Sequence, residues 1–128
     1  MANASAAIYE VMPDLNWAGF YRVFGDGLIL GPFQGKVACT RSPYGKGVCG
    51  TALAQKKAQL VPDVHAFPGH IACDSASASE LVIPLPDASG EVRAVLDLDS
   101  PSLGRFTQAD LDGLQPLAEL FAPLFPME

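Results

Sequence analysis

Two strand–turn–strand patterns constrain the fold of this 128-residue chain more than any other feature of its sequence. In the first, the aromatic-rich segment Trp17–Phe24 runs into the strong turn signal Gly25-Asp26-Gly27. In the second, the apolar segments Leu81–Leu85 and Val92–Leu98 are joined by a turn at residues 87–90. Because both patterns predict neighbouring strands, we expect a β-sheet to form the centre of the fold.

Weaker signals predict the elements around this sheet. Residues 4–12 form a short helix that Pro13 ends, and Leu28–Leu30 begins the strand that returns from the first turn. The sheet is expected to continue over Phe33–Cys39, and a Pro- and Gly-rich loop follows at residues 40–47.

The second half of the chain begins with a predicted helix over Val48–Lys57 and a short strand over Gln59–Val61. A last helix starts at Thr107, which forms a capping-box pattern with Asp110, and Pro116 is predicted to kink or split this helix. Together these elements predict an α+β fold in which one central, mostly antiparallel sheet is flanked by helices.

The composition is that of a compact globular protein, with 49% hydrophobic and 17% charged residues, and residues 1–128 are expected to form one domain. The net charge of −6 and the lack of a basic stripe argue against a nucleic-acid partner. No apolar run approaches the roughly 20 residues of a membrane span, and the N-terminus lacks the pattern of a secretory signal. An odd cysteine count of 3 fits a reducing cytoplasm better than a secreted disulfide framework.

Cys39, Cys49 and Cys73 stand beside Gly, Pro or polar turn residues rather than inside apolar runs. This placement suits thiols that react, because buried structural thiols are usually inert. The long segment Pro62–Ser79 predicts a functional lid or binding loop, and it carries Cys73 together with both histidines. The residues alone do not rank the three thiols, and Cys73 is favoured only by its place on that segment. The alternative is that Cys39 and Cys49 are small core residues.

Several motifs, taken in chain order, resemble those of one enzyme family. They lie at Asn16–Tyr21, Gly31–Cys39, Pro43–Thr51, Val61–Ser75, Ser79–Glu80 and Val95–Pro101. Together they resemble the free methionine-(R)-sulfoxide reductases, which are built on the GAF fold, and the resemblance covers residues 16–112. The helical region before the first motif is shorter here than in that family.

The resemblance implies reduction of free L-methionine (R)-S-oxide to L-methionine by thiol chemistry. In such a reaction a thiolate attacks the sulfoxide sulfur, becomes a sulfenic acid and is resolved as a disulfide. The family pattern makes Cys73 the attacking thiol, Cys39 the resolving thiol and Cys49 a secondary or backup thiol. It also implies no bound cofactor, a thioredoxin-type dithiol as electron donor, and a homodimer. The alternative function is a non-enzymatic GAF sensor that binds a small ligand and uses its thiols as a redox switch.

Glu80, Asp97 and Asp99 are the candidate acids of this site. Asp97 and Asp99 are two residues apart on a predicted strand, so they are expected to share one face. Acids in an apolar strand are costly unless they are paired or protonated, which suits a proton donor to a sulfoxide oxygen. The resemblance assigns all three to sulfoxide and amine binding, with Glu80 and Asp99 as catalytic acids. The alternative is that Asp97 and Asp99 cap the turn at Ser100-Pro101.

Trp17 and Tyr21 are four residues apart on a predicted strand and therefore share a face. Aromatic walls suit a thioether and its methyl group, so the motif favours a substrate-binding role for both, although an isolated Trp is more often a core residue. His65 and His70 with the cysteines fit no common zinc spacing, so we predict no metal site. Hydrogen bonding within the loop is the favoured role of both histidines.

Overall fold

The computed structural model describes residues 1–69 and 76–124. Its elements are, in chain order, α1 (Ala2–Val11), β1 (Trp17–Phe24), β2 (Gly27–Gly35), β3 (Arg41–Pro43), α2 (Gly47–Gln55), β4 (Gln59–Val61), the 3₁₀ turn η1 (Val64–Ala66), β5 (Ser79–Pro86), β6 (Val92–Ser100), α3 (Gln108–Phe121) and the 3₁₀ turn η2 (Ala122–Leu124). Six strands form one sheet in the order β3-β2-β1-β6-β5-β4, and each neighbouring pair is antiparallel. The predicted α+β fold with a central antiparallel sheet is confirmed.

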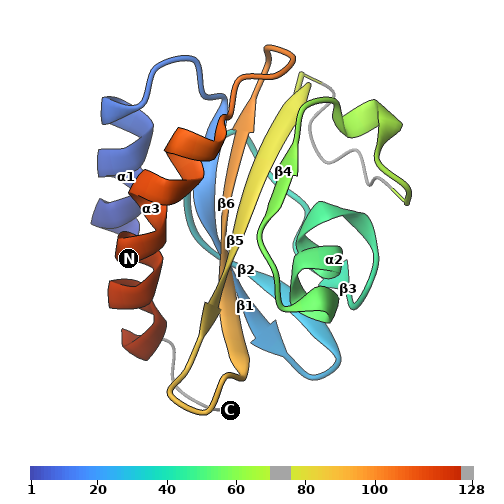
Figure 1. Ribbon diagram of the computed structural model, residues 1–128, viewed down its shortest axis with the longest axis vertical. Helices are drawn as coiled ribbons and strands as arrows, with labels where there is room; N and C mark the ends of the chain where they lie inside the picture. Colours follow the sequence, from blue (N-terminus) through green and yellow to red (C-terminus); the bar gives the residue numbers. More distant parts are fainter. Residues whose placement is uncertain (70–75, 125–128) are drawn as a thin grey trace.

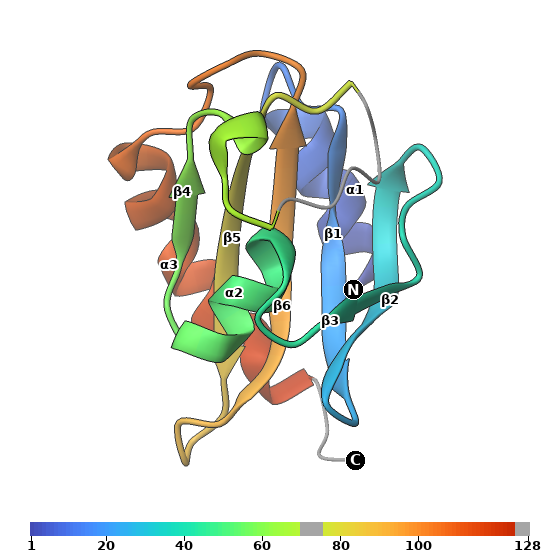
Figure 2. The same cartoon turned by 90° about the vertical axis from the view of Figure 1, so that its right-hand side faces the viewer.

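Helices cover both faces of the sheet. Figure 1 shows α1 and α3 side by side on one face and α2 on the other, and Figure 2 looks onto the face that α2 covers. Strand side chains alternate between faces, so β6 contributes to both cores. Leu96 packs into the core under α1 and α3, whereas Val95 packs into the core under α2. Asp97 follows this alternation and therefore faces α2.

The strongest local signals gave correct element bounds. β1 and β4 begin and end where the sequence predicts, at Trp17–Phe24 and Gln59–Val61. The capping box is also present: the Thr107 side chain accepts from the backbone of Asp110, and the Asp110 carboxylate accepts from the Thr107 N–H at 2.9 Å. These signals are reliable because they depend on neighbours in the chain rather than on distant contacts.

The predicted strand over Phe33–Cys39 is wrong in its second half, because β2 ends at Gly35 with a φ of +129°. The predicted loop at residues 40–47 is also partly wrong, since it contains the edge strand β3. There Arg41 pairs with Ile29 and Pro43 with Gly27, an edge position where a proline is tolerated. The chain between β2 and β3, which carries Cys39, is therefore a connection at the edge of the sheet rather than a strand.

Of the two predicted effects of Pro116, splitting of the last helix is wrong, because α3 runs without interruption from Gln108 to Phe121, whereas a kink stays a prediction. A proline removes the hydrogen bond to the carbonyl four residues earlier, here that of Asp112. Both residues are solvent-exposed, so water can satisfy that carbonyl. Within the described parts of the chain, no helix combines the length and the apolar character that a bilayer crossing requires.

Candidate active site

Two rows of residues cross neighbouring strands on the sheet face that α2 covers. In the first row, Trp17 of β1 pairs with Asp99 of β6, which pairs with Glu80 of β5. In the second row, Gly19 of β1 pairs with Asp97 of β6. Directly opposed residues of adjacent strands share a face, so the three candidate acids lie together. The prediction that Asp97 and Asp99 share one face is confirmed.

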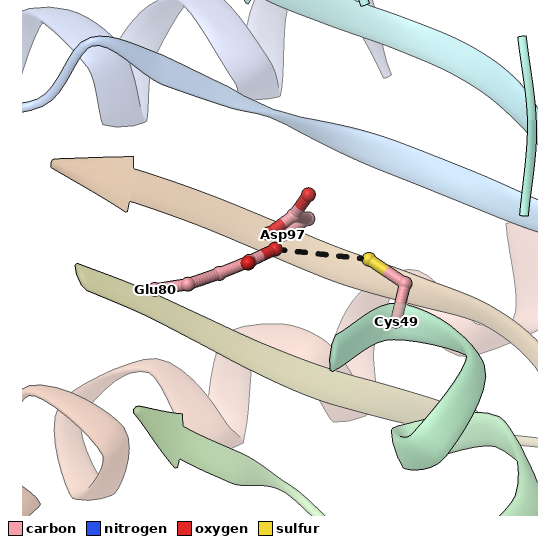
Figure 3. Close-up of side chains that lie close together, drawn as sticks. All are labelled: Cys49, Glu80 and Asp97. Atoms are coloured by element: carbon pink, nitrogen blue, oxygen red, sulfur yellow. Dashed lines mark hydrogen bonds between the residues drawn. The ribbon is translucent and has the colours of Figure 1, made fainter. Parts of the chain in front are cut away.

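The start of α2 places Cys49 over these acids. Gly47 has a φ of +66°, which lets the chain turn from β3 into the helix. A Cβ atom on Gly50 would collide with the backbone carbonyl of Pro43, so glycine allows the first turn of α2 to lie close to β3. The buried Cys49 then directs its Sγ atom toward Glu80 and donates a weak hydrogen bond to Oε2 at 4.0 Å (Figure 3).

Burial controls the protonation of this cluster. It raises the pKa of Glu80 well above the ordinary value, and repulsion from Asp97 and Asp99 raises it further. Burial also raises the pKa of Asp97, although hydrogen bonds from Glu80 and Cys49 oppose the rise. The pKa of Cys49 is raised first by burial and then by the charge of Asp97. Glu80 and Cys49 therefore hold their protons more tightly than exposed groups of the same kind, and burial makes Cys49 a poor source of nucleophilic thiolate.

Trp17 and Tyr21 anchor the connection that carries Cys39. The Trp17 ring is buried and stacks on Tyr21 and Phe33, with centroid distances of 5.7 and 5.2 Å. The prediction that Trp17 and Tyr21 share a face is confirmed. Trp17 Nε1 donates to the carbonyl of Lys36 at 3.2 Å. The Tyr21 hydroxyl donates to the carbonyl of Cys39 at 3.1 Å. The two aromatic residues thus fix the backbone next to this cysteine.

Two glycines make room for the Trp17 ring. A Cβ atom on Gly19 would lie 2.8 Å from Cη2 of Trp17 and would overlap Phe33. A Cβ atom on Gly35 would lie 2.7 Å from Cδ1 of the same ring. Real Cβ atoms do not approach other atoms so closely, so the absence of side chains at these positions seats the indole against the sheet.

The cysteines within the described residues differ in state. Cys39 is partly exposed and disulfide-bonded, whereas Cys49 is a buried free thiol. Cys73, the favoured attacking thiol, lies outside the described residues. The core alternative therefore applies to Cys49, which packs with the apolar residues under α2, and not to Cys39.

The predicted loop hydrogen bonding is confirmed for His65. Its backbone N–H donates to Oδ1 of Asp63 at 3.0 Å, and its ring Nδ1 lies 3.3 Å from the same oxygen. His70 lies outside the described residues. Nothing in these contacts connects His65 with the acids on the sheet.

Two contacts near the acids were not predicted. Asn16 Nδ2 donates to Oγ of Ser77 at 3.1 Å, which ties the start of β1 to the chain that enters β5. The contact between Cys49 and Glu80 joins residues 31 positions apart. The spacing of these residues along the chain does not predict either contact. Asn16 could have been selected only because it stands in the motif around Trp17.

A thiol and two carboxyl groups also form a potential ligand set. One ligand atom each of Cys49, Glu80 and Asp97 lies within 4.8 Å of the others, and all three residues are buried. Sulfur and carboxylate oxygen are both ligands of zinc in proteins. The same groups can act as proton donors, so the cluster can serve acid–base chemistry or cation binding.

Comparison with known proteins gives consistent matches over nearly the whole chain. The GAF domain family model matches residues 4–125. The chain is 56% identical over 117 residues to the free methionine-R-sulfoxide reductase of Escherichia coli (strain K12), covering 91% of this chain and 70% of that protein. It is 46% identical over 127 residues to the Saccharomyces cerevisiae protein of the same name, covering 94% and 71%. The structure of the Neisseria meningitidis free methionine-R-sulfoxide reductase with its substrate superposes with a TM-score of 0.92 at 45% identity, covering 97% and 74%.

Proposed function

Since the chain belongs to the GAF-domain family of free methionine-R-sulfoxide reductases, we propose that it reduces free L-methionine (R)-S-oxide to L-methionine. The observation that carries this proposal is the buried pair of acids Glu80 and Asp97, the first with a raised pKa, in a chain whose Cys39 is disulfide-bonded. Sulfoxide reduction needs both an acid and a cysteine, because the oxygen must be protonated as sulfur is attacked. A thiol supplies the two electrons.

The proposed reaction proceeds in three steps. The Cys73 thiolate attacks the sulfoxide sulfur while the oxygen takes up one proton. The oxygen then passes to the Cys73 sulfur as its bond to the substrate sulfur breaks, so the products are methionine and the sulfenic acid of Cys73. The Cys39 thiol then attacks the sulfenic sulfur, which forms a Cys39–Cys73 disulfide and releases water. An external dithiol of the thioredoxin type reduces that disulfide by thiol–disulfide exchange, as expected in a reducing cytoplasm.

Two features support these roles for the described cysteines. Cys39 is disulfide-bonded and partly exposed, as a resolving thiol must be at the end of the oxidative half-reaction. Cys49 is free and buried, and burial raises its pKa, so it would react slowly. We therefore propose Cys49 as a secondary thiol that acts only when Cys39 is missing.

The acids divide between proton donation and amine binding. Glu80 carries a raised pKa, so we propose that it donates the proton to the sulfoxide oxygen. Asp99 pairs directly with Glu80 across β5 and β6. This pairing supports a role for Asp99 as a second catalytic acid next to Glu80. Asp97 and Asp99 share the face of Glu80, and we propose that they bind the ammonium group of the substrate. We propose that Trp17 and Tyr21 contribute the apolar side of the same substrate-binding site.

Turnover with a small dithiol tests the proposed function. The protein, reduced with dithiothreitol, is expected to convert free L-methionine (R)-S-oxide to methionine over many cycles. The (S)-epimer is the matched control, since it presents the same groups with the sulfoxide oxygen reversed, and it should remain unreduced. A protein that binds the (R)-epimer but releases no methionine would instead be a GAF sensor.

A further inference from the structure

Cys49, Glu80 and Asp97 reach one point from three different elements, α2, β5 and β6 (Figure 3). Their ligand atoms lie within 4.8 Å of one another, and the Sγ–Oε2 distance between the first two is 4.0 Å. Around a tetrahedral zinc ion, with Zn–S of about 2.3 Å and Zn–O of about 2.0 Å, ligand atoms lie roughly 3.5 Å apart. Small rotations of these side chains would therefore bring the three atoms to coordinating distance.

A second observation points to a missing partner. Oδ1 of Asp97 is buried without a hydrogen-bond partner, and the residue is only 4% exposed. A buried carboxylate oxygen without a partner is energetically unfavourable. Within the described parts of the chain, neither Asp97 nor Glu80 forms an ion pair with a basic residue. A cation is the kind of ligand that would satisfy this oxygen.

We propose that Cys49, Glu80 and Asp97 form a binding site for a thiophilic divalent cation, of which Zn²⁺ is the best match. Three protein ligands leave a fourth coordination position open. The mixed sulfur and oxygen ligands exclude Mg²⁺ and Ca²⁺, which bind oxygen almost exclusively. Spacing of cysteines and histidines does not reveal this site, because two of its ligands are carboxylates from neighbouring strands.

Binding of the cation is an exchange for protons. A cysteine coordinates as the thiolate and a carboxyl group as the carboxylate, so any proton on these groups is released as the ion binds. The same acids are proposed to bind substrate, so a bound cation would exclude methionine sulfoxide. This consequence, unlike the binding itself, rests on the proposed function.

The test uses Cd²⁺ as a probe, because thiolate coordination gives it an ultraviolet charge-transfer band. Serine replaces the other two cysteines (Cys39→Ser with Cys73→Ser), so that Cys49 is the only thiol and no turnover is involved. We expect one equivalent of Cd²⁺ to saturate the band and Zn²⁺ to displace it. Adding Cys49→Ala should abolish the band, and Cys49→Ser is a second variant in case alanine disturbs the packing of α2.

Substitutions of the two carboxylate ligands distinguish a site with three ligands from metal binding by the Cys49 thiol alone. Asp97→Asn and Glu80→Gln should each weaken Cd²⁺ binding by at least about tenfold while the band remains. Glu119→Gln, an exposed carboxylate on α3, is the matched control and should leave affinity unchanged. A missing band in the folded double-serine protein, or equal affinity in all three carboxylate variants, would overturn the proposal.

The exclusion of substrate is tested separately on the unmodified protein. Reduced, desalted protein should release less methionine in a single turnover when Zn²⁺ is present, and a chelator should restore the release. Full release at a Zn²⁺ concentration that displaces Cd²⁺ would refute competition with substrate. No release with or without the cation would refute the proposed function, while the Cd²⁺ band would still report on the site.

Discussion

The Sγ atom of Cys49 lies 4.0 Å from Oε2 of Glu80, and both side chains are buried. This contact joins the first turn of α2 to the acids on β5 and β6. A thiol is a weak donor, so this contact compensates little for the hydration that the carboxyl group loses on burial. Burial, followed by repulsion from Asp97 and Asp99, raises the pKa of Glu80, and several outcomes depend on it.

Reductase activity should decline as pH rises through the raised pKa of Glu80. In this range kcat/KM should fall, because the proton donor to the sulfoxide oxygen is lost. Glu80→Gln should lower kcat by about 10²–10⁴-fold, the usual contribution of a general acid, and should remove this decline. The measurement is kcat/KM as a function of pH for the unmodified protein and for Glu80→Gln. An unchanged decline in Glu80→Gln would assign the proton donor to another group.

Conformational stability should fall as pH rises from the ordinary pKa of Glu80 to its raised pKa in the folded state. The ordinary pKa of Glu80 is 4.5 and its pKa in the folded state is higher, so the folded state binds more protons between these values. Its contribution to stability is thus complete below the unfolded pKa and is lost as pH rises through the folded pKa. Each unit of separation changes the free energy of unfolding by about 1.4 kcal/mol.

Urea unfolding at several pH values tests this linkage. Glu80→Gln should show a smaller decline of unfolding free energy with rising pH than the unmodified protein. Glu119→Gln, which removes an exposed carboxylate, is the control and should keep the full decline. Parallel curves for Glu80→Gln and the unmodified protein would mean that Glu80 ionises normally.

Gly19→Ala should destabilise the protein and displace Trp17. The added Cβ atom would lie 2.8 Å from the Trp17 ring and would overlap Phe33. Overpacking of this kind costs about 1–3 kcal/mol. Gly113→Ala is the matched control, because its Cβ atom meets nothing within 4 Å. Gly113 lies in α3, where alanine should increase the free energy of unfolding by about 0.5–1 kcal/mol. Thermal melts and tryptophan fluorescence would show both effects, and equal stability of the two variants would contradict the packing argument.

Elements with local signals could be predicted from the sequence, whereas those that depend on pairing could not. The aromatic segment of β1 and the capping box at Thr107 carry their information in adjacent residues. The edge strand β3 is only three residues long and contains Pro43, so its composition resembles a loop. It becomes a strand because Arg41 and Pro43 meet β2 in register.

The candidate site shows the same division. The shared face of Asp97 and Asp99 follows from their spacing on one strand, and that of Trp17 and Tyr21 does likewise. The proximity of Cys49 to the acids could not be predicted. It depends on how closely α2 approaches the sheet, which the collision of a side chain at position 50 with β3 makes evident only in three dimensions.

The two cysteines of the proposed redox pair should differ in single turnover. Cys73→Ser should release no methionine, because no sulfenic acid can form. Cys39→Ser should release about one equivalent and then stall or slow, because resolution fails after the first attack. Methionine is quantified against enzyme without added dithiol for the single turnover, and with a thioredoxin-type dithiol for repeated turnover. Full activity in Cys73→Ser would overturn the role assignment, and fast multiple turnover in Cys39→Ser would make Cys49 the resolving thiol.

The enzyme should prefer the free amino acid over any substrate with a blocked nitrogen. Glu80, Asp97 and Asp99 lie on one sheet face. Proton donation needs one carboxyl group, so the other two call for another role. A free ammonium group accounts for the surplus, because it would compensate carboxylates that are otherwise buried. N-acetyl-methionine sulfoxide lacks that charge, and a site built for a polar group discriminates strongly against its absence.

We expect kcat/KM for the N-acetyl compound to be at least about a hundredfold lower than for free methionine (R)-S-oxide. The methyl ester is the matched control, because it keeps the ammonium group and changes only the carboxyl end. If the acids recognise the ammonium group, the ester should lose less activity than the N-acetyl compound. Asp97→Asn should then bring the kcat/KM values of the free and N-acetylated substrates closer together, since it removes part of the negative charge that binds the ammonium group. Equal efficiency on both substrates would show that the acids serve proton transfer alone.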